Sequence, residues 1–157
     1  MTLVRLVLFL AVSIFAGALK NQLASKIHAT TRLSGASMAS IVHDTLQVSL
    51  GDRSYPIYIG EGLIGKGRGS ELRKHVTSKK TLIVTNTKVG PLYLAAVKES
   101  LENSGSEVFE VILPDGEEFK TMDVLMKIID KAMEVKLDRK STFIALGGGV
   151  VGDMTGK

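Results

Sequence analysis

Residues 141–153 read STFIALGGGVVGD, an apolar run that breaks into three glycines and then reaches a carboxylate. The run at 143–146 is long enough for one buried β-strand. Because glycine lacks a Cβ, the chain after it can turn sharply and its backbone N–H groups can come close to a phosphate. Ordinary strand-to-helix turns also use glycine, so the stretch by itself leaves both interpretations open.

A second loop of similar chemistry lies earlier in the chain. Residues 113–120 read LPDGEEFK and follow another apolar run at 108–113. Both loops carry carboxylates, and both follow predicted strands. Since the carboxyl ends of parallel strands lie at one edge of a sheet, the two loops are expected to face one crevice.

Together the two loops resemble the 3-dehydroquinate synthase family, whose members carry a D-G-E-x-x-K loop and then an A-L-G-G-G-V-x-G-D turn. Here they read DGEEFK at 115–120 and ALGGGVVGD at 145–153. The resemblance runs from about residue 45 to residue 156 and includes VTNTKVGPLY at 84–93. It is similar to the plant enzymes above all, and it covers only the first part of the family's fold.

The resemblance implies a carbon–oxygen lyase of the shikimate pathway, which leads to chorismate and the aromatic amino acids. In this family, bound NAD transiently oxidises a hydroxyl of 3-deoxy-D-arabino-heptulosonate 7-phosphate. Phosphate is then eliminated, and re-reduction and ring closure give 3-dehydroquinate. A divalent metal, zinc or cobalt, polarises the reacting groups.

The family's metal ligands, a glutamate and two histidines, belong to a helical C-terminal domain that this sequence lacks. We therefore expect a truncated chain without synthase activity of its own. The resemblance implies NAD and a sugar-acid phosphate as partners, and a homodimer for the intact enzyme. The oligomeric state of the fragment stays open.

The resemblance also assigns cofactor-binding residues position by position. Asn86 and Lys88 fall where an adenosine-side ribose is held, and Glu117 and Lys120 fall where ribose and phosphate are contacted. The candidates for the pyrophosphate and nicotinamide portion are Gly148, Gly149, Val150 and Asp153. A carboxylate suits ribose hydroxyls, a lysine suits phosphate, and glycine N–H groups suit pyrophosphate oxygens.

Without the resemblance, plainer interpretations of these residues stay open. Glu117, Lys120 and Asp153 also fit solvated charges near a helix start, and Asn86 fits a turn residue. No catalytic residue is assigned. No metal site is predicted either, because the histidines are scattered along the chain at His28, His43 and His75.

Charge separates the first 40 residues from the rest. All 16 acidic residues lie after His43, whereas four of the 20 Lys and Arg residues precede it. The other 16 basic residues balance the 16 acidic ones, so the net charge of +4 comes from the first 40 residues. The balanced remainder argues against a nucleic-acid partner.

Residues 1–40 are predicted to be a leader outside the core, and residues 41–157 to be the NAD-binding domain. The stretch at 3–19 is mostly apolar, like a signal peptide or signal anchor, but is shorter than a spanning helix. Residues 21–40 are rich in Ser, Thr and Ala and lack acid, which is typical of a transit peptide. We favour a cleaved chloroplast transit segment, or an incorrectly joined upstream exon with Met38 close to a more usual start. A secretory signal, or a membrane anchor through 3–19, is the alternative.

Hydrophobic periodicity predicts the remaining elements. Alternating residues at 46–59 predict a β-hairpin, and a short helix is expected near 70–75. Strands are expected at 81–85, 108–113 and 142–146, with a helix after the first strand that starts at Pro91 and a helix after the second. The second helix is expected to bury one face, which comprises Val124, Leu125, Ile128, Ile129, Ala132 and Met133. The positions expected in or near the core also include Met122 and Met126.

Strands that alternate with helices of this length imply a mostly parallel sheet. The predicted fold class is therefore α/β, a Rossmann-like three-layer unit with an added β-hairpin. Ligands in such sheets bind beyond the carboxyl ends of the strands. The loops at 85–88, 115–120 and 147–153 all lie there, as a dinucleotide requires.

Three functions of different classes remain. The first is the cofactor part of a 3-dehydroquinate synthase, which the two motifs in order favour. The second is a fragment of a related sugar-phosphate cyclase or of a polyol dehydrogenase. The third is a non-catalytic module that binds a nucleotide, or a partner chain, through an exposed sheet face.

Overall fold

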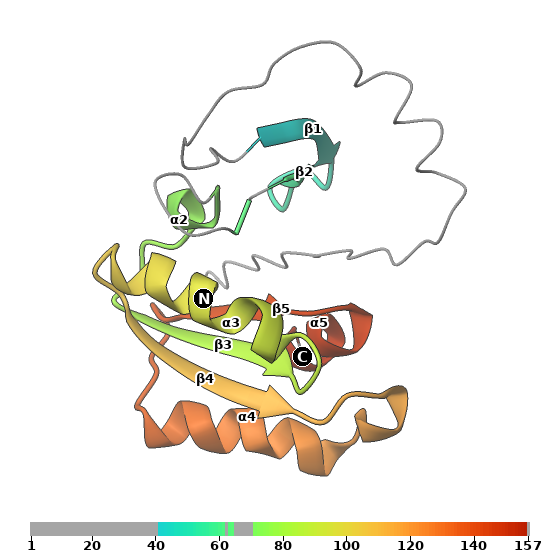
Figure 1. The fold of residues 1–157 in the computed structure, drawn as a ribbon, viewed down its shortest axis with the longest axis vertical. Helices are drawn as coiled ribbons and strands as arrows, with labels where there is room; N and C mark the ends of the chain where they lie inside the picture. The colour runs from blue at the N-terminus through green and yellow to red at the C-terminus, as the bar shows by residue number, and fades with distance from the viewer. Residues whose placement is uncertain (1–40, 62, 65–70, 157) are drawn as a thin grey trace.

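A parallel three-stranded sheet lies at the centre of the computed structural model, which describes residues 41–61, 63–64 and 71–156 (Figure 1). The predicted leader at 1–40 is outside the described residues. The central strand β3 (Lys80–Asn86) pairs in parallel with β4 (Glu107–Leu113) on one side and with β5 (Thr142–Leu146) on the other. The predicted α/β fold class is confirmed.

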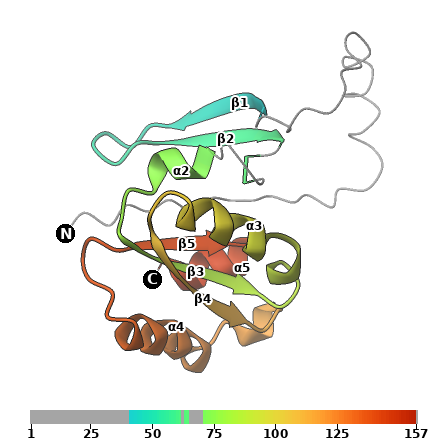
Figure 2. The same ribbon diagram turned by 60° about the vertical axis from the view of Figure 1, so that its left-hand side comes forward.

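Helices cover both faces of this sheet, with α3 (Gly90–Glu102) on one face and α4 (Met122–Glu134) and α5 (Gly149–Thr155) on the other (Figures 1 and 2). Side chains alternate along a strand, so β3 supplies both layers of the core. Ile83 packs on the α3 side, while Leu82 and Val84 pack on the side of α4 and α5.

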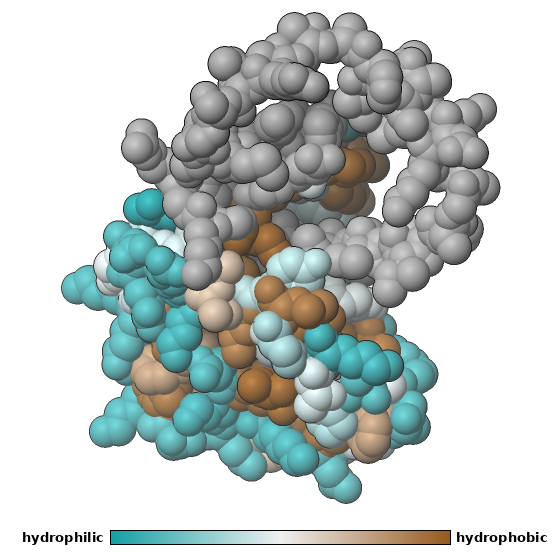
Figure 3. Space-filling model, in the orientation of Figure 1, coloured by the Kyte–Doolittle hydropathy of each residue, from teal (hydrophilic) through white to brown (hydrophobic). Residues whose placement is uncertain are grey.

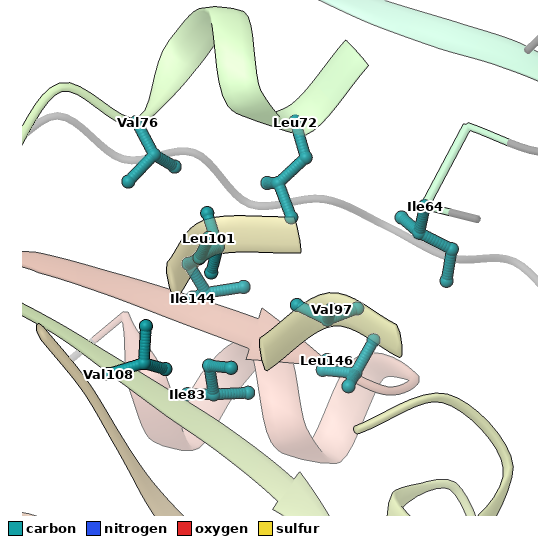
Figure 4. Close-up of a cluster of buried hydrophobic side chains, with 9 residues drawn as sticks. All are labelled: Ile64, Leu72, Val76, Ile83, Val97, Leu101, Val108, Ile144 and Leu146. Atoms are coloured by element: carbon teal, nitrogen blue, oxygen red, sulfur yellow. The ribbon is translucent and has the colours of Figure 1, made fainter. Parts of the chain in front are cut away.

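The α3-side cluster also holds α2 (Glu71–His75) onto the sheet. Leu72 of α2 packs with Val97 and Leu101 of α3 and with Ile144 of β5, as Figure 4 shows. Each of these side chains is almost completely buried. The short predicted helix is therefore real, and its apolar contact with α3 fixes its position.

A β-hairpin lies beyond α2 and is separate from the central sheet (Figure 1). Its strands are β1 (Ile41–Val48) and β2 (Tyr55–Glu61), which pair antiparallel. The ring centroids of Tyr58 and His75 are 5.5 Å apart, so β2 contacts α2 through an aromatic pair. The predicted hairpin is confirmed.

The α4 helix has the predicted position, but its predicted buried face is partly wrong. Val124 and Ile128 are buried against the sheet. Ile129 and Met133 were expected beside them, yet they are 42% and 75% exposed. The sheet contacts only one narrow stripe of the helix, because the 3.6-residue period turns neighbouring positions away from it.

The methionines expected in or near the core lie in the same exposed stripe of α4. Met122 is 68% exposed and Met126 is 42% exposed. Apolar residues also reach the surface elsewhere, as the brown patches among teal polar residues in Figure 3 show for one face. Within the described part of the chain, no helix combines the length and the hydropathy needed to cross a membrane.

Candidate functional site

The candidate site lies beyond the carboxyl ends of β3, β4 and β5. The chain leaves β3 toward α3 on one face of the sheet and leaves β5 toward α5 on the other. The strand order β4-β3-β5 therefore has a topological switch point between β3 and β5. Ligands of open α/β sheets bind in the crevice outside such a point.

Asn86 ends β3 and connects two of the loops at this edge. Its side-chain Oδ1 accepts hydrogen bonds from the backbone N–H groups of Lys88, at 3.2 Å, and Val89, at 2.8 Å. Its Nδ2 donates to Oδ1 of Asp115 at 2.7 Å. These three bonds fix the orientation of the buried amide and join the turn after β3 to the loop after β4.

Lys88 and Asp115 form an ion pair across the same two loops. The Lys88 Nζ lies 2.6 Å from Oδ2 of Asp115. The lysine side chain is 78% exposed, whereas that of the aspartate is 27% exposed. The hydrogen bond to Asp115 raises the pKa of Lys88 above its ordinary value, so the lysine keeps its charge to a higher pH than it otherwise would.

Lys120 connects the loop after β4 to α5. It follows the 3-10 turn η1 (Glu117–Phe119), and its Nζ lies 2.8 Å from Oδ2 of Asp153 and 3.4 Å from Oε1 of Glu117. The hydrogen bond to Asp153 and then that to Glu117 raise the pKa of Lys120. The ammonium group of Lys120 thus meets two other predicted site residues, one three positions before it and one 33 positions after it.

Neighbouring glycines of the loop after β5 have different structural roles. A Cβ on the buried Gly147 would lie 2.7 Å from Cγ2 of Val151, so packing requires glycine there. A Cβ on Gly148 or Gly149 would have no atom within 4 Å, and neither residue has a positive φ. Gly148 is the N-cap residue of α5, with φ −86° and ψ −162°.

Glycine is not the preferred residue at the position of Gly148. Ser, Thr, Asp and Asn are all better N-cap residues, and L residues adopt these backbone angles without strain. Backbone conformation, packing and capping therefore leave the absence of a side chain at Gly148 unexplained. The open space above Gly148 and Gly149 gives an incoming group direct access to the backbone.

Val150 differs from the other predicted site residues. Its side chain is half-buried and packs against the cluster that α4 and α5 share with the sheet. Only its backbone can therefore serve a ligand at the sheet edge while the side chain keeps its place in the core.

The described residues do not fit a metal site. Within 41–61, 63–64 and 71–156, no three His, Cys, Asp or Glu side chains gather closely enough to hold a metal ion. His75 lies in α2, where it contacts Tyr58 and is remote from the loops after the strands.

Sequence comparison connects this arrangement to known enzymes. A family model described as "3-dehydroquinate synthase N-terminal" matches residues 110–157, which include the Lys120 loop and the glycine turn. A 3-dehydroquinate synthase of Hydrogenovibrio crunogenus is 58% identical over 113 residues, which are 71% of this chain and 30% of the relative. This sequence matches the N-terminal part of the 3-dehydroquinate synthases.

Plant synthases match at a similar level. The chloroplastic 3-dehydroquinate synthase of Arabidopsis thaliana is 55% identical over 71% of this chain and 25% of its own length. That of Solanum lycopersicum is 50% identical over 78% of this chain and 28% of its own length. The chain therefore spans less than a third of the synthase relatives it matches.

Solved structures show the same fold at low sequence identity. A 2-deoxy-scyllo-inosose synthase, complexed with carbaglucose-6-phosphate, NAD+ and Co2+, has a TM-score of 0.62 at 19% identity. The match covers 72% of this chain and 31% of that protein. A second structure of a 2-deoxy-scyllo-inosose synthase has a TM-score of 0.60 at 19% identity.

The sequence analysis missed Asp115 as a site residue. Although it is the first residue of the DGEEFK motif that resembles the synthases, the roles assigned to that motif went to Glu117 and Lys120. A short polar side chain directly after a buried strand and before a glycine was the available signal. Asn86 and Lys88 were named as candidate site residues, but they lie 29 and 27 residues from Asp115, so the sequence could not show that they contact it.

Proposed function

We propose that this chain is the NAD-binding part of a 3-dehydroquinate synthase. The observation that carries the proposal is the pair Gly148 and Gly149, which lack a side chain where neither packing nor a positive φ requires glycine. Their N–H groups lie at the topological switch point, where dinucleotides bind in related sheets. The 58% identity to a named synthase supports this enzyme as the origin of the site.

The surrounding residues fit a dinucleotide by their chemistry. The exposed Glu117 carboxylate accepts hydrogen bonds from ribose hydroxyls, and the Lys120 ammonium pairs with phosphate. Asp153 and Glu117 orient Lys120 before the ligand arrives. NAD, when bound, supplies reversible oxidation of a substrate hydroxyl.

We propose the family's reaction for the whole enzyme only: it converts a sugar-acid phosphate to 3-dehydroquinate and releases phosphate. The solved cyclase contains Co2+ with its NAD+, but the residues described here do not fit a metal. We therefore propose that this chain binds NAD and does not release phosphate from the heptulosonate phosphate by itself.

A related sugar-phosphate cyclase or a polyol dehydrogenase is less well supported as the parent enzyme. The solved cyclases share the fold at 19% identity, whereas the named synthases reach 50% to 58% identity over a similar part of the chain. Sequence at this level of similarity favours the synthase over the cyclase.

Chloroplast targeting is part of the same proposal. The Arabidopsis and tomato relatives are both named chloroplastic, and residues 1–40 have the composition of a transit segment. A fusion of residues 1–40 to a fluorescent protein is expected to enter plastids in plant cells. Secretion of the fusion, or retention at a membrane, would support the alternative leader.

Calorimetric titration of NAD into the full chain tests the proposed function. We expect saturable binding, and we expect Gly148→Asn to raise the dissociation constant at least about tenfold. The reason is that the added side chain would block the hydrogen bonds from the backbone N–H groups to the pyrophosphate. Asparagine is a good N-cap residue, so α5 is retained and only the open space is filled.

The matched control is Gly51→Asn in the turn between β1 and β2. Gly51 has φ +60° and no neighbour within 4 Å of an added Cβ, and asparagine tolerates that conformation. This control should bind NAD as the unmodified chain does. A folded chain that binds no NAD, or a Gly148→Asn variant that binds it normally, contradicts the proposed function.

A further inference from the structure

The ion pair of Lys88 and Asp115 has no assigned role in the proposed function. Asp115 accepts from Asn86 through Oδ1 and pairs with Lys88 through Oδ2, at 2.7 and 2.6 Å. Asn86 is itself held by the backbone N–H groups of the turn after β3. The Asp115 carboxylate is therefore fixed by Asn86, and it in turn holds the flexible, exposed side chain of Lys88 in place.

This arrangement determines the charge at the ends of β3 and β4. Asp115 neutralises Lys88, while Glu117 and Glu118 lie exposed on the same loop. Lys120 is occupied by Asp153 and Glu117. Three carboxylates thus stand against two lysines on these two loops.

Dinucleotide sites in such sheets distinguish two cofactors by this type of charge. A carboxylate near the adenosine ribose accepts a hydrogen bond from its 2′-hydroxyl, whereas a free basic side chain accommodates a 2′-phosphate. The glycines that would meet the pyrophosphate lie after β5, so a dinucleotide that crosses the switch point places one nucleoside toward β3 and β4. The family resemblance implies that this nucleoside is adenosine.

We propose that Asp115 determines specificity at this site: by holding Lys88 it keeps a basic group away from the adenosine ribose and selects NAD against NADP. Asp115 is a positioning residue, because it acts through Lys88 and Asn86. The inference rests on the proposed function, since it requires that the chain binds a dinucleotide there.

The test measures the dissociation constants of NAD and NADP for the full chain and its variants by calorimetry. Asp115→Asn retains an oxygen acceptor for Asn86 but removes the charge that holds Lys88. We expect the preference for NAD over NADP to fall about tenfold, since a carboxylate is lost and a lysine is freed. Adding Lys88→Met to Asp115→Asn should reverse part of that change.

Two further variants complete the test. Lys88→Met alone leaves Asp115 without its cation, so the preference for NAD over NADP should rise. This change is opposite to the one expected for Asp115→Asn, and it tests the inference even if Asp115→Asn fails to fold. Asp130→Asn removes the same charge from an exposed position on α4 and should leave the preference unchanged.

The outcomes separate this inference from the proposed function. NAD binding by the unmodified chain, with ratios in Asp115→Asn and Lys88→Met that stay within about twofold of the original, overturns the specificity role alone. An unmodified, folded chain that binds neither dinucleotide overturns the proposed function, and the specificity role with it. Circular dichroism of every variant verifies that it is folded.

Discussion

The interior of the parallel sheet and its charged rim differ in what their residues do. In the interior, Leu82, Ile83 and Val84 of β3 have no exposed surface. The charged rim, which we define as Lys88, Asp115, Glu117, Lys120 and Asp153, lies only a few residues beyond the strand ends and is largely exposed. The interior supplies the free energy of folding, and the rim supplies polar groups at a fixed place.

This difference makes a general point about α/β sheets. A buried strand resists substitution because each side chain fills space on which its neighbours depend. Exposed ion pairs contribute little to stability, because water screens their charges. Substitutions in the interior are therefore expected to change stability, and substitutions at the rim to change ligand binding. The following experiments test that separation, from the largest effect on stability to the smallest.

Ile83→Ala is expected to have the largest effect. Ile83 is completely buried between α3 and the sheet, so its truncation should lower the free energy of unfolding by about 2–5 kcal/mol. Urea denaturation followed by circular dichroism measures the change. Leu92→Ala is the control, because Leu92 on α3 is 69% exposed. Equal losses in the two variants would contradict the comparison.

Gly147→Ala tests the boundary between the two regions. The added Cβ would lie 2.7 Å from Cγ2 of Val151, and this overpacking should cost about 1–3 kcal/mol of unfolding free energy. The same denaturation measurement applies. Combining it with Val151→Ala removes the contact with Cγ2 and leaves only the Val151 Cβ, at 3.0 Å, so the two substitutions should destabilise less together than the sum of their separate effects. Strict additivity would show that the clash is not the cause.

Gly148→Asn, one residue farther on, should separate stability from binding. Its unfolding free energy should stay the same or rise by a few tenths of a kcal/mol, because asparagine caps α5 better than glycine does. Its NAD affinity should fall as described above. A loss of stability comparable to that of Gly147→Ala would place Gly148 in the interior and would remove the argument for an open approach.

Asp153→Asn should lower the melting temperature at neutral pH only slightly, because its ion pair with Lys120 is exposed, and should alter the alkaline limit of NAD binding. Asp153 is the main cause of the raised pKa of Lys120, so the substitution should lower that pKa toward its ordinary value of 10.5. At a pH below the ordinary lysine pKa, the ion pair that raises the pKa of Lys120 contributes in full to the stability of the folded chain. This contribution is lost as the pH rises through the folded-state pKa.

The measurement for Asp153→Asn is NAD affinity as a function of pH in the alkaline range. Affinity should decline at lower pH in the variant than in the unmodified chain, since Lys120 loses its proton sooner. Asp130→Asn on α4 is the control for net charge. Identical alkaline profiles in all three proteins would show that Lys120 does not contact the cofactor's phosphate.

Met133→Gln is expected to have little effect on either stability or NAD binding. Met133 is 75% exposed on α4, so the unfolding free energy should change by less than about 0.5 kcal/mol. Ile128→Ala on the buried side of the same helix should cost about 2–5 kcal/mol. A large loss in Met133→Gln would mean that the exposed stripe is covered in solution.

Local pattern was sufficient to predict most elements of the fold. The apolar run at 142–146 is β5 with the same bounds, and the alternating residues at 46–59 lie in the hairpin. Pro91 stands in the first turn of α3, as expected. These predictions succeeded because strand alternation and helix starts depend on residues that are close together in the sequence.

The same pattern could not show which apolar residues of α4 become buried. Ile128 and Ile129 are adjacent and chemically identical, yet one is 3% exposed and the other 42%. Helical spacing predicts an apolar face, but the width of the buried stripe depends on where the sheet lies. The position of the sheet against α4 therefore decided which apolar residues of the helix are buried.

The site was predicted as a set of loops but not as a network. Asn86, Lys120 and Asp153 were named from the motifs, and the structure places them at one edge of the sheet. That Asp115 holds Asn86 and Lys88, and that Asp153 lies 2.8 Å from Lys120, required the folded chain. Each of these contacts joins residues that are at least 27 positions apart in the sequence.

By itself, the sequence determined the α/β fold, the order of the elements and the presence of a glycine-rich loop at the sheet edge. These features follow from side-chain size, polarity and spacing within short segments. Only the tertiary structure decided that Gly147 is required by packing and Gly148 is not, and which carboxylate holds which lysine. The reason is physical: packing and ion pairing depend on distances in space, and parallel pairing with β3 is what brings the ends of β4 and β5 together.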